Sequence, residues 1–428
     1  MRGRSSRQSK VRPSHRQAFT LVGIFLGNAL EWFDFVLFGY FATVFARLFF
    51  PTESQIASIA LAFGTFALTF LVRPFGAIVL GAYGDRYGRK SALILSTALI
   101  TVGTGIIAIL PSYSRWGAAA PLILMLARTI QGFSAGGEFG SVTAFLAESS
   151  PSRRGFLSSL QFSGQGLTAL LAASFGAALT GLLTTAQLYS WGWRLPFLFG
   201  VVIGPITYFI RLYAAETPEF RPTASPLKKL LTDGLKRAFI SAAAVTLGTV
   251  ITYTIVYLPS YAHIYLHITA YNSFLGGALT GILLVCLTPI AGALSDRYGR
   301  LPTIFPPALI ILLASYPIFA WLAASPSLGR LLIVQSIIGC LAAWYLGVLP
   351  SLMSELFPAA YRTTGLSVSY AFAVTTFGGG APLINTLLIE LTGNRLALSF
   401  YLMAAAVISL IGLIAARQIG IGKMGSEK

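Results

Sequence analysis

Five ionisable side chains lie within long apolar stretches of the 428-residue chain, namely Glu31, Asp34, Arg73, Arg128 and Glu138. If such a stretch spans a membrane, a charge at its centre costs about 2.5–3.5 kcal/mol, so these groups pair or line water. An apolar cavity favours a protonated carboxylate, and a nearby Arg opposes it. We therefore interpret Glu31, Asp34 and Glu138 as candidates for proton coupling. In the alternative interpretation, which applies to Glu31 and Arg73 among others, these charges form structural ion pairs that hold the N-terminal bundle together.

Arg128 is the main candidate for binding an anion. A guanidinium forms two parallel hydrogen bonds with a carboxylate, which the Lys ammonium does not. Gln131 and Glu138 are seven residues apart and share one face of a continuous helix. Aromatic residues at helical spacing serve packing as readily as binding. With that alternative open, the other candidates for substrate contact are Arg73, Asn28, Gln131, Gln161, Gln165, Tyr253, Tyr257 and Asn385.

The elements that position these residues are transmembrane helices. Of all residues 55% are hydrophobic and 10% charged, with a mean hydropathy of +0.76, whereas a soluble chain carries about 25% charged residues. A spanning helix needs about 20 residues, and lipid leaves no other way to satisfy the backbone of such long segments. We expect twelve all-α spans, at 18–48, 57–83, 91–111, 119–148, 156–181, 193–213, 238–266, 272–297, 302–324, 328–357, 363–392 and 395–420.

The basic residues indicate the topology. With the N-terminus inside, 23 of the 30 Lys and Arg fall in inside loops and tails, as expected for a cytoplasmic side. The net charge of +17 then follows from topology, and no nucleic-acid partner is expected. The predicted parts are a basic cytoplasmic tail, an N-terminal six-helix bundle, a cytoplasmic linker, a C-terminal six-helix bundle and a second cytoplasmic tail, at 1–17, 18–213, 214–237, 238–420 and 421–428.

A repeated motif relates the two bundles. Gly81–Lys90 and Gly292–Leu301 both contain Gly-Ala and Asp-Arg-Tyr-Gly-Arg, and a Glu-Pro-Arg-Gly pattern follows the fourth helix of each half, at Glu148 and Glu355. Parallel halves of this kind place a substrate at their interface near the midplane. In this alignment Arg128 corresponds to Gln335, so the positive charge is not required by the shared scaffold.

The sequence lacks motifs that would indicate another class of protein. No strand precedes the basic Gly-rich loop and no GK[ST] follows it, which argues against a phosphate-binding loop. An enzyme would need a nucleophile–base pair or a metal cluster, and the sequence contains no HExxH pattern, so we do not expect an enzyme. His263 and His267 have no third ligand nearby, so neither a metal nor a cofactor is expected. The longest polar stretch, Ala214 to Arg237, is too short for a signalling domain.

The chain resembles the major facilitator superfamily over nearly its whole length, and within it the metabolite–proton symporter family. The resemblance lies in the Asp-Arg-Tyr-Gly-Arg turns and in Gly27–Phe35, Arg73–Gly76, Arg128–Gly132, Gly136–Glu138 and Glu216–Pro218. The patterns at Phe38–Pro51, Gly378–Pro382 and Leu391–Gly393 are most similar to citrate and tricarballylate carriers.

This resemblance implies a proton-coupled symporter that imports a small organic acid, citrate or a related di- or tricarboxylate, by alternating access. The alternative substrates are 2-oxoglutarate, shikimate, proline and betaine. Co-transported H+ and the lipid bilayer would be its partners, and we expect a monomer in the inner membrane with both termini cytoplasmic.

The resemblance also implies a cytoplasmic gate at the repeated motifs. Asp85 would face the start of the eleventh helix near Arg362, and Asp296 the start of the fifth near Arg154, because a helix N-terminus favours a carboxylate. The full set of candidate gate residues is Asp85, Arg86, Arg89, Glu148, Arg154, Asp296, Arg297, Arg300, Glu355 and Arg362.

Overall fold

The computed structural model describes residues 28–29, 32–87, 89–213, 226–358 and 361–420. Glu31, both predicted tails and residues 214–225 of the predicted linker lie outside these residues, as do the side chains of 81–93, which include Asp85, Arg86 and Arg89. The described part is helical and contains no strand. Within it, each of the twelve predicted stretches holds helix.

The N-terminal bundle begins with the helix Trp32–Tyr40. It continues through α2 (Ala42–Phe49), α3 (Gln55–Tyr87), α4 (Arg89–Ile109), α6 (Ala119–Ser134), η1 (Ala135–Gly137), α7 (Glu138–Glu148), α8 (Arg154–Leu182) and α10 (Leu195–Tyr213), with short helices α5 (Tyr113–Trp116), η2 (Pro151–Arg153), α9 (Thr185–Ser190) and η3 (Gly192–Arg194) in the connections.

The C-terminal bundle is preceded by α11 (Pro226–Lys229) and the π-helix η4 (Leu230–Gly234). It comprises α12 (Leu235–Ile264), α13 (Ala270–Tyr298), α14 (Arg300–Ala324), α15 (Leu328–Leu356), α16 (Arg362–Ala373), η6 (Val374–Gly378), α17 (Ala381–Thr392) and α18 (Ala397–Gln418).

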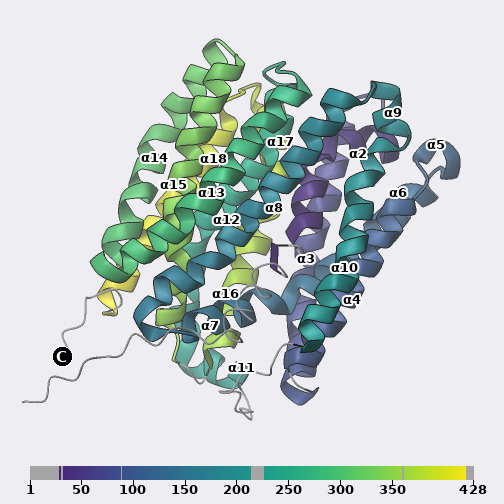
Figure 1. Ribbon diagram of the computed structural model, residues 1–428. Helices are drawn as coiled ribbons and strands as arrows, with labels where there is room; N and C mark the ends of the chain where they lie inside the picture. The colour runs from purple at the N-terminus through teal and green to yellow at the C-terminus, as the bar shows by residue number, and fades with distance from the viewer. Residues whose placement is uncertain (1–27, 30–31, 88, 214–225, 359–360, 421–428) are drawn as a thin grey trace, which may run out of the picture.

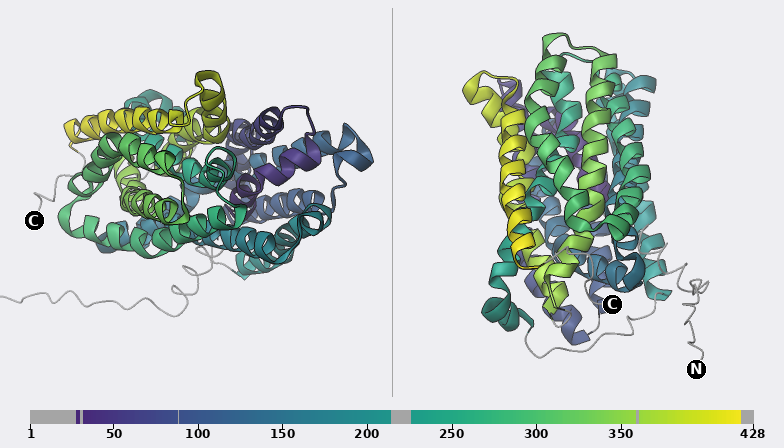
Figure 2. Two further views of the ribbon diagram at one scale, coloured as in Figure 1. Left: turned by 90° about the horizontal axis from the view of Figure 1, so that it is seen from above. Right: turned by 90° about the vertical axis from the view of Figure 1, so that its left-hand side faces the viewer.

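The two bundles stand side by side with their helices roughly parallel, α3, α4, α6 and α10 on the right in Figure 1 and α14, α15 and α18 on the left; Figure 2 gives the view along the helices. Among the described residues eight helices are long and apolar enough to cross a membrane, and a bent pair at Phe41 adds a ninth. The end that carries the α7–α8 and α13–α14 junctions is the one predicted to face the cytoplasm, and we call it the predicted cytoplasmic end.

Three predicted spans are interrupted where a continuous helix was expected. The first bends by 70° at Phe41, the fourth narrows to the 3-10 turn η1, and the eleventh passes through the π-helix η6 and a turn at Gly379 and Gly380. Glycine is the poorest helix former after proline, and η1 contains two glycines. The predicted fourth span is therefore not one unbroken α-helix between Gln131 and Glu138.

Glycines bring helices into close contact. Gly132 lies against the backbone of Thr69, and Gly136, one turn later, against that of Arg73, so α6 and η1 pack tightly on α3. This small-xxx-small arrangement suits membranes, where association rests on close van der Waals contact. Gly166 of α8 and Gly281 of α13 join the two bundles in the same way.

Candidate functional site

Asp34 lies in the helix Trp32–Tyr40 and is 3% exposed. Its Oδ2 accepts hydrogen bonds from the hydroxyl of Thr104 and, at 3.3 Å, from Nε2 of Gln131. Oδ1 has no hydrogen-bond partner in the part of the chain that the structure describes. It lies beside Gly200 of α10, where an added Cβ would approach it to 2.9 Å. The missing side chain at Gly200 thus makes room for the carboxylate between α4 and α10.

Gln131 connects this carboxylate to Arg128. Its Oε1 accepts a hydrogen bond from Nη1 of Arg128 at 2.8 Å. Its Nε2 donates to Asp34, and to the hydroxyl of Thr104 at 3.0 Å. The neutral amide thus bridges the guanidinium and the carboxylate through its two ends.

Arg128 and Arg73 are two nearly inaccessible cations near the centre of the molecule, with 0% and 3% of their surface exposed. In each, Nε and Nη2 find no hydrogen-bond partner among the described residues. Aromatic faces surround them: Cζ of Arg128 is 4.4 Å from the Phe38 ring centroid, and that of Arg73 is 4.5 Å from Phe70. Cation–π contacts of this kind compensate part of the desolvation, but the N–H groups stay available to an anion.

Both bundles contribute buried neutral polar groups, Tyr253 and Asn385 from the C-terminal bundle and Gln165 from α8 of the N-terminal bundle. The Tyr253 ring centroid is 4.9 Å from that of Phe70, which also contacts Arg73. Over the described residues, the Tyr253 hydroxyl and both amide atoms of Asn385 and Gln165 have no hydrogen-bond partner, although all three residues are buried. Buried polar atoms are normally paired, so these groups fit contact with a polar molecule.

Three other candidates are occupied by contacts within the protein. Asn28 donates through Nδ2 to the backbone oxygen of Gln161 at 3.1 Å. The Oε1 of Gln161 accepts from Thr143, whereas its Nε2 has no hydrogen-bond partner among the described residues. The hydroxyl of Tyr257 accepts from Thr386 at 3.2 Å. These contacts give the three side chains a structural role, whatever further role they have.

Glu138 is buried, at 4% exposure, in the first turn of α7. The next residue, Phe139, stacks on Tyr370 of α16 with ring centroids 3.4 Å apart. Sequence reasoning missed this contact between the bundles. It also missed Thr104. The only local signal for this residue was its position between two glycines.

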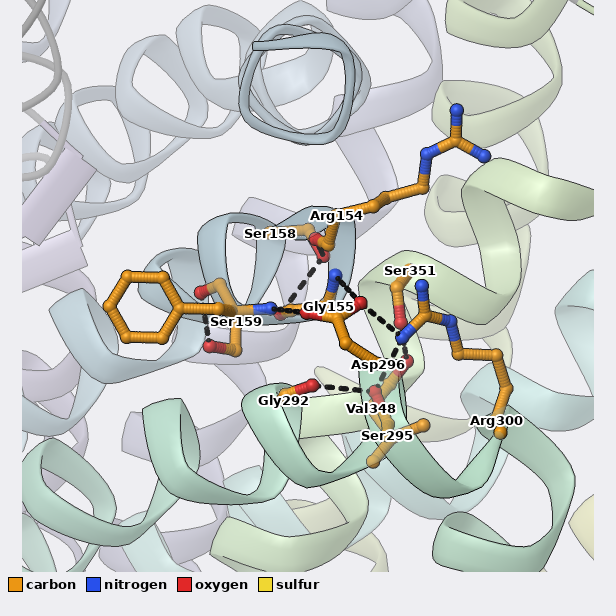
Figure 3. A network of polar contacts seen from close by, with 12 residues as sticks. Arg154, Gly155, Ser158, Ser159, Gly292, Ser295, Asp296, Arg300, Val348 and Ser351 are labelled. Carbon is orange, nitrogen blue, oxygen red and sulfur yellow. Dashed lines mark hydrogen bonds and ion pairs between the residues drawn. The ribbon is translucent and has the colours of Figure 1, made fainter. Parts of the chain in front are cut away.

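At the predicted cytoplasmic end, Asp296 contacts the start of α8 (Figure 3). Its Oδ1 and Oδ2 accept hydrogen bonds from the backbone N–H groups of Gly155 and Phe156 at 2.8 and 3.0 Å. These N–H groups have no partner within their own helix. The Arg154 side chain turns away and donates to the Ala147 carbonyl at 3.3 Å, so it is the backbone beside Arg154 that meets Asp296.

Arg300 links this carboxylate to a second one. Its Nη1 lies 2.7 Å from Asp296 and its Nε 2.9 Å from Glu355. Arg297 instead lies over the ring of Tyr298, with Cζ 5.4 Å from the centroid. Arg300 therefore joins α13, α14 and α15 within the C-terminal bundle.

A second contact between the bundles joins Glu148 and Arg362. Nη1 of Arg362 donates to the Glu148 carboxylate at 2.7 Å, and its Nε donates to the Ser354 carbonyl at 3.0 Å. The ion pair thus connects the end of α7 to the start of α16. Like the contact between Asp296 and α8, it lies at the predicted cytoplasmic end.

Two parallel helix bundles with charged groups at mid-depth and ion pairs at one end define a polytopic membrane transporter. The sequence profile of the Major Facilitator Superfamily matches residues 24–381, and the chain belongs to that superfamily. A citrate-proton symporter of Klebsiella pneumoniae is 38% identical over 392 residues, 90% of this chain and 88% of its own length. A glycine betaine/proline/ectoine/pipecolic acid transporter of Dickeya dadantii is 32% identical over 414 residues, 92% of this chain and 82% of its own.

A solved structure confirms the fold. The xylose transporter of E. coli, in a partially occluded inward-open conformation, matches with a TM-score of 0.73 over 97% of this chain and all of its own, at 16% identity. The predicted membership of the superfamily and the predicted all-helical fold are confirmed, and the chain is a transporter and not an enzyme.

Proposed function

We propose that this chain is a proton-coupled symporter that imports citrate or a closely related di- or tricarboxylate across the inner membrane, with both termini in the cytoplasm. The observation that carries the proposal is Arg128, a fully buried guanidinium whose Nε and Nη2 have no protein partner over the described residues. The name of the relative from Klebsiella pneumoniae supports the same substrate.

The substrate would lie between the bundles, with carboxylates on Arg128 and Arg73. Hydrogen bonds to a charged partner contribute about 1.5–3 kcal/mol each, which offsets part of the desolvation of an anion. Tyr253, Asn385 and Gln165 would bind its remaining oxygens, because they are buried and have unpaired polar atoms over the described residues.

Asp34 would carry the proton. With Asp34 ionised, Gln131 holds its amide N–H toward the carboxylate and its oxygen toward Arg128. An anion that attracts Arg128 releases this amide, and a carboxylate that loses hydrogen bonds takes up a proton more readily. Binding of substrate and of proton then favour each other. Glu138 and Glu31 are further candidates for the same task.

Proton coupling suits a multivalent anion for energetic reasons. Moving one negative charge inward against an inside-negative potential costs about 2.3 kcal/mol per 100 mV, so a trianion costs about 7 kcal/mol. Each co-transported proton cancels one of these charges.

The second candidate is a carrier of zwitterions such as betaine or proline. The relative from Dickeya dadantii supports it. A zwitterion has one carboxylate, however, and presents a cation that two buried guanidinium groups would repel. The presence of both Arg73 and Arg128 favours the polycarboxylate.

The experiment is uptake of labelled citrate into proteoliposomes, with and without an inward proton gradient, in competition with tricarballylate, 2-oxoglutarate, shikimate, proline and betaine. We expect a gradient to accelerate citrate uptake and the tricarboxylates to compete best. Competition by betaine or proline alone would favour the second candidate. No uptake of any of these compounds would reject both.

A further inference from the structure

Prolines release a backbone carbonyl in the middle of two helices that face the opposite bundle. Pro74 in α3 and Pro289 in α13 have no N–H, so the carbonyls four residues earlier, at Phe70 and Val285, have no helical partner. Water cannot reach such a group inside a closed membrane protein, and an unsatisfied carbonyl there is costly. Each carbonyl must therefore find a donor elsewhere.

In both cases the donor is a hydroxyl of the other bundle. Thr375 of η6 donates to the Phe70 oxygen at 2.9 Å. Ser163 of α8 donates to the Val285 oxygen at 3.0 Å. One bond thus runs from the C-terminal to the N-terminal bundle, and the other runs in the reverse direction.

The two bonds occupy corresponding places in the two halves. α3 and α13 are the second spans of their bundles, and α8 and α16–α17 are the fifth. Halves related by an axis along the membrane normal therefore carry these bonds on opposite flanks of the interface. The prolines are 215 residues apart and the repeated motifs 211, so the second proline is displaced by about one helical turn.

A hydroxyl–carbonyl bond is well suited to a contact that must break and re-form. A water molecule replaces such a donor at nearly equal enthalpy, whereas an ordinary helical carbonyl already has its backbone partner. The carbonyl can therefore lose its hydrogen bond to the hydroxyl of the other bundle only when water enters and replaces the donor. Opening of the predicted cytoplasmic end would bring in that water.

We propose that Ser163 and Thr375 are positioning residues of the transport cycle, which hold the bundles together at mid-depth while the predicted cytoplasmic end is closed. Each stabilises this state by satisfying a carbonyl that a proline has released in the facing bundle. The proposal rests on alternating access, as in the proposed function, but not on the substrate or on proton coupling.

The test measures how often the predicted cytoplasmic end opens. In the full-length protein with Cys286 and Cys340 replaced by Ala, Ser159→Cys adds a thiol at a buried position beside Gly292, and its rate of maleimide labelling reports the opening. Loss of one net hydrogen bond predicts labelling about fivefold faster in Ser163→Ala. Ser163→Thr, which keeps a hydroxyl, should label at the parent rate.

The proline supplies the decisive comparison. In Pro289→Ala the new N–H satisfies Val285, so adding Ser163→Ala should no longer accelerate labelling. Thr180→Val is the matched control, because its hydroxyl bonds carbonyls of its own helix, those of Gly176 and Ala177. Thr375→Val with Pro74→Ala forms the parallel pair on the other flank. An unchanged rate in Ser163→Ala, or equal acceleration with and without Pro289, would overturn the proposal. Labelling requires neither substrate nor a proton gradient, so failure of the citrate assignment leaves this test intact.

Discussion

The side-chain amide of Gln131 donates to Oδ2 of Asp34 at 3.3 Å, so a neutral group holds the candidate proton carrier on the side that faces Arg128. The same amide accepts from Arg128 through its oxygen. The amide cannot exchange its oxygen and its nitrogen without breaking both hydrogen bonds. In the proposed coupling between Arg128 and Asp34, the oxygen therefore stays toward Arg128 and the N–H toward Asp34, and mutations can test this arrangement.

Asp34→Asn should abolish acceleration of uptake by a proton gradient and leave counterflow exchange measurable. Asn keeps a side-chain oxygen that accepts hydrogen bonds from Thr104 and Gln131, but its amide does not take up a proton in the pH range of transport. The measurement is labelled uptake into proteoliposomes under gradient and exchange conditions. Full proton coupling in this variant would show that Asp34 is not the proton carrier.

Gly200→Ala should impair the same coupling although it neither removes nor adds a polar group. The new Cβ would approach Asp34 Oδ1 to 2.9 Å, a contact tight enough to displace the carboxylate from Gln131. Gly64→Ala is the matched control, because nothing lies within 4 Å of a Cβ there. We expect gradient-driven uptake to fall about tenfold in Gly200→Ala and to stay normal in the control. Equal behaviour of the two variants would show that the space beside Asp34 is unimportant.

Arg128→Lys should weaken equilibrium binding of the polycarboxylate by about ten- to a hundredfold, since an ammonium does not form the two parallel bonds of a guanidinium. Arg47→Lys serves as the control, because Arg47 also lies over an aromatic ring, that of Tyr189 at 4.5 Å, but at the end opposite the predicted gate. Binding is measured by displacement of labelled citrate from the purified protein. Unaltered affinity in Arg128→Lys would move the anion site elsewhere.

Glu148→Gln should raise the opening rate of the predicted cytoplasmic end. The Glu148–Arg362 pair is partly exposed, with side chains 27% and 15% accessible, so the expected effect is about 1 kcal/mol or less, roughly up to fivefold. The exchange Glu148→Arg with Arg362→Glu should restore part of the contact. Labelling of the thiol from Ser159→Cys provides the readout, and no recovery in the exchanged pair would mean that the two charges act separately.

Asp296→Asn should lower the transport rate more than the substrate affinity. An amide oxygen can accept from the N–H of Gly155 but its nitrogen cannot accept from Phe156, and the charge facing the N-terminus of α8 is lost. Comparing maximal uptake with equilibrium binding separates the two effects. Asp85→Asn, at the repeated motif, should act in the same direction. A loss confined to affinity would contradict a gate at this position.

The sequence predicts the fold well because apolar length, basic asymmetry and the repeated motif are local properties. It also predicts that Asp34, Arg128 and Gln131 matter, because charged and amide groups are rare in apolar helices. Thr104 escaped notice because a Thr in such a helix ordinarily bonds the preceding turn, as it does here to Ile100 at 2.9 Å. The stack of Phe139 on Tyr370 depends on how the two bundles meet, and a single sequence contains no local signal for that.

The bend and the breaks were equally hard to foresee. Glycines at 136 and 137 allow a 3-10 turn, but glycines are frequent in membrane helices for packing as well. Gly136 does contact the backbone of Arg73, but this contact exists only in the assembled bundle, so the sequence alone does not tell the two uses of glycine apart.

The surroundings of Asp34 and Arg128 differ in one respect that concerns how such proteins diversify. Asp34 is enclosed by Thr104 and Gly200, both from the N-terminal bundle. Arg128 lies among Phe38 and Phe66, and Phe66 in turn touches Tyr253 of the C-terminal bundle. Under the proposed roles, the proton carrier lies within the N-terminal bundle, whereas the substrate site is formed by both bundles. Substitutions in the C-terminal bundle can then change the substrate specificity without altering the contacts of the proton carrier.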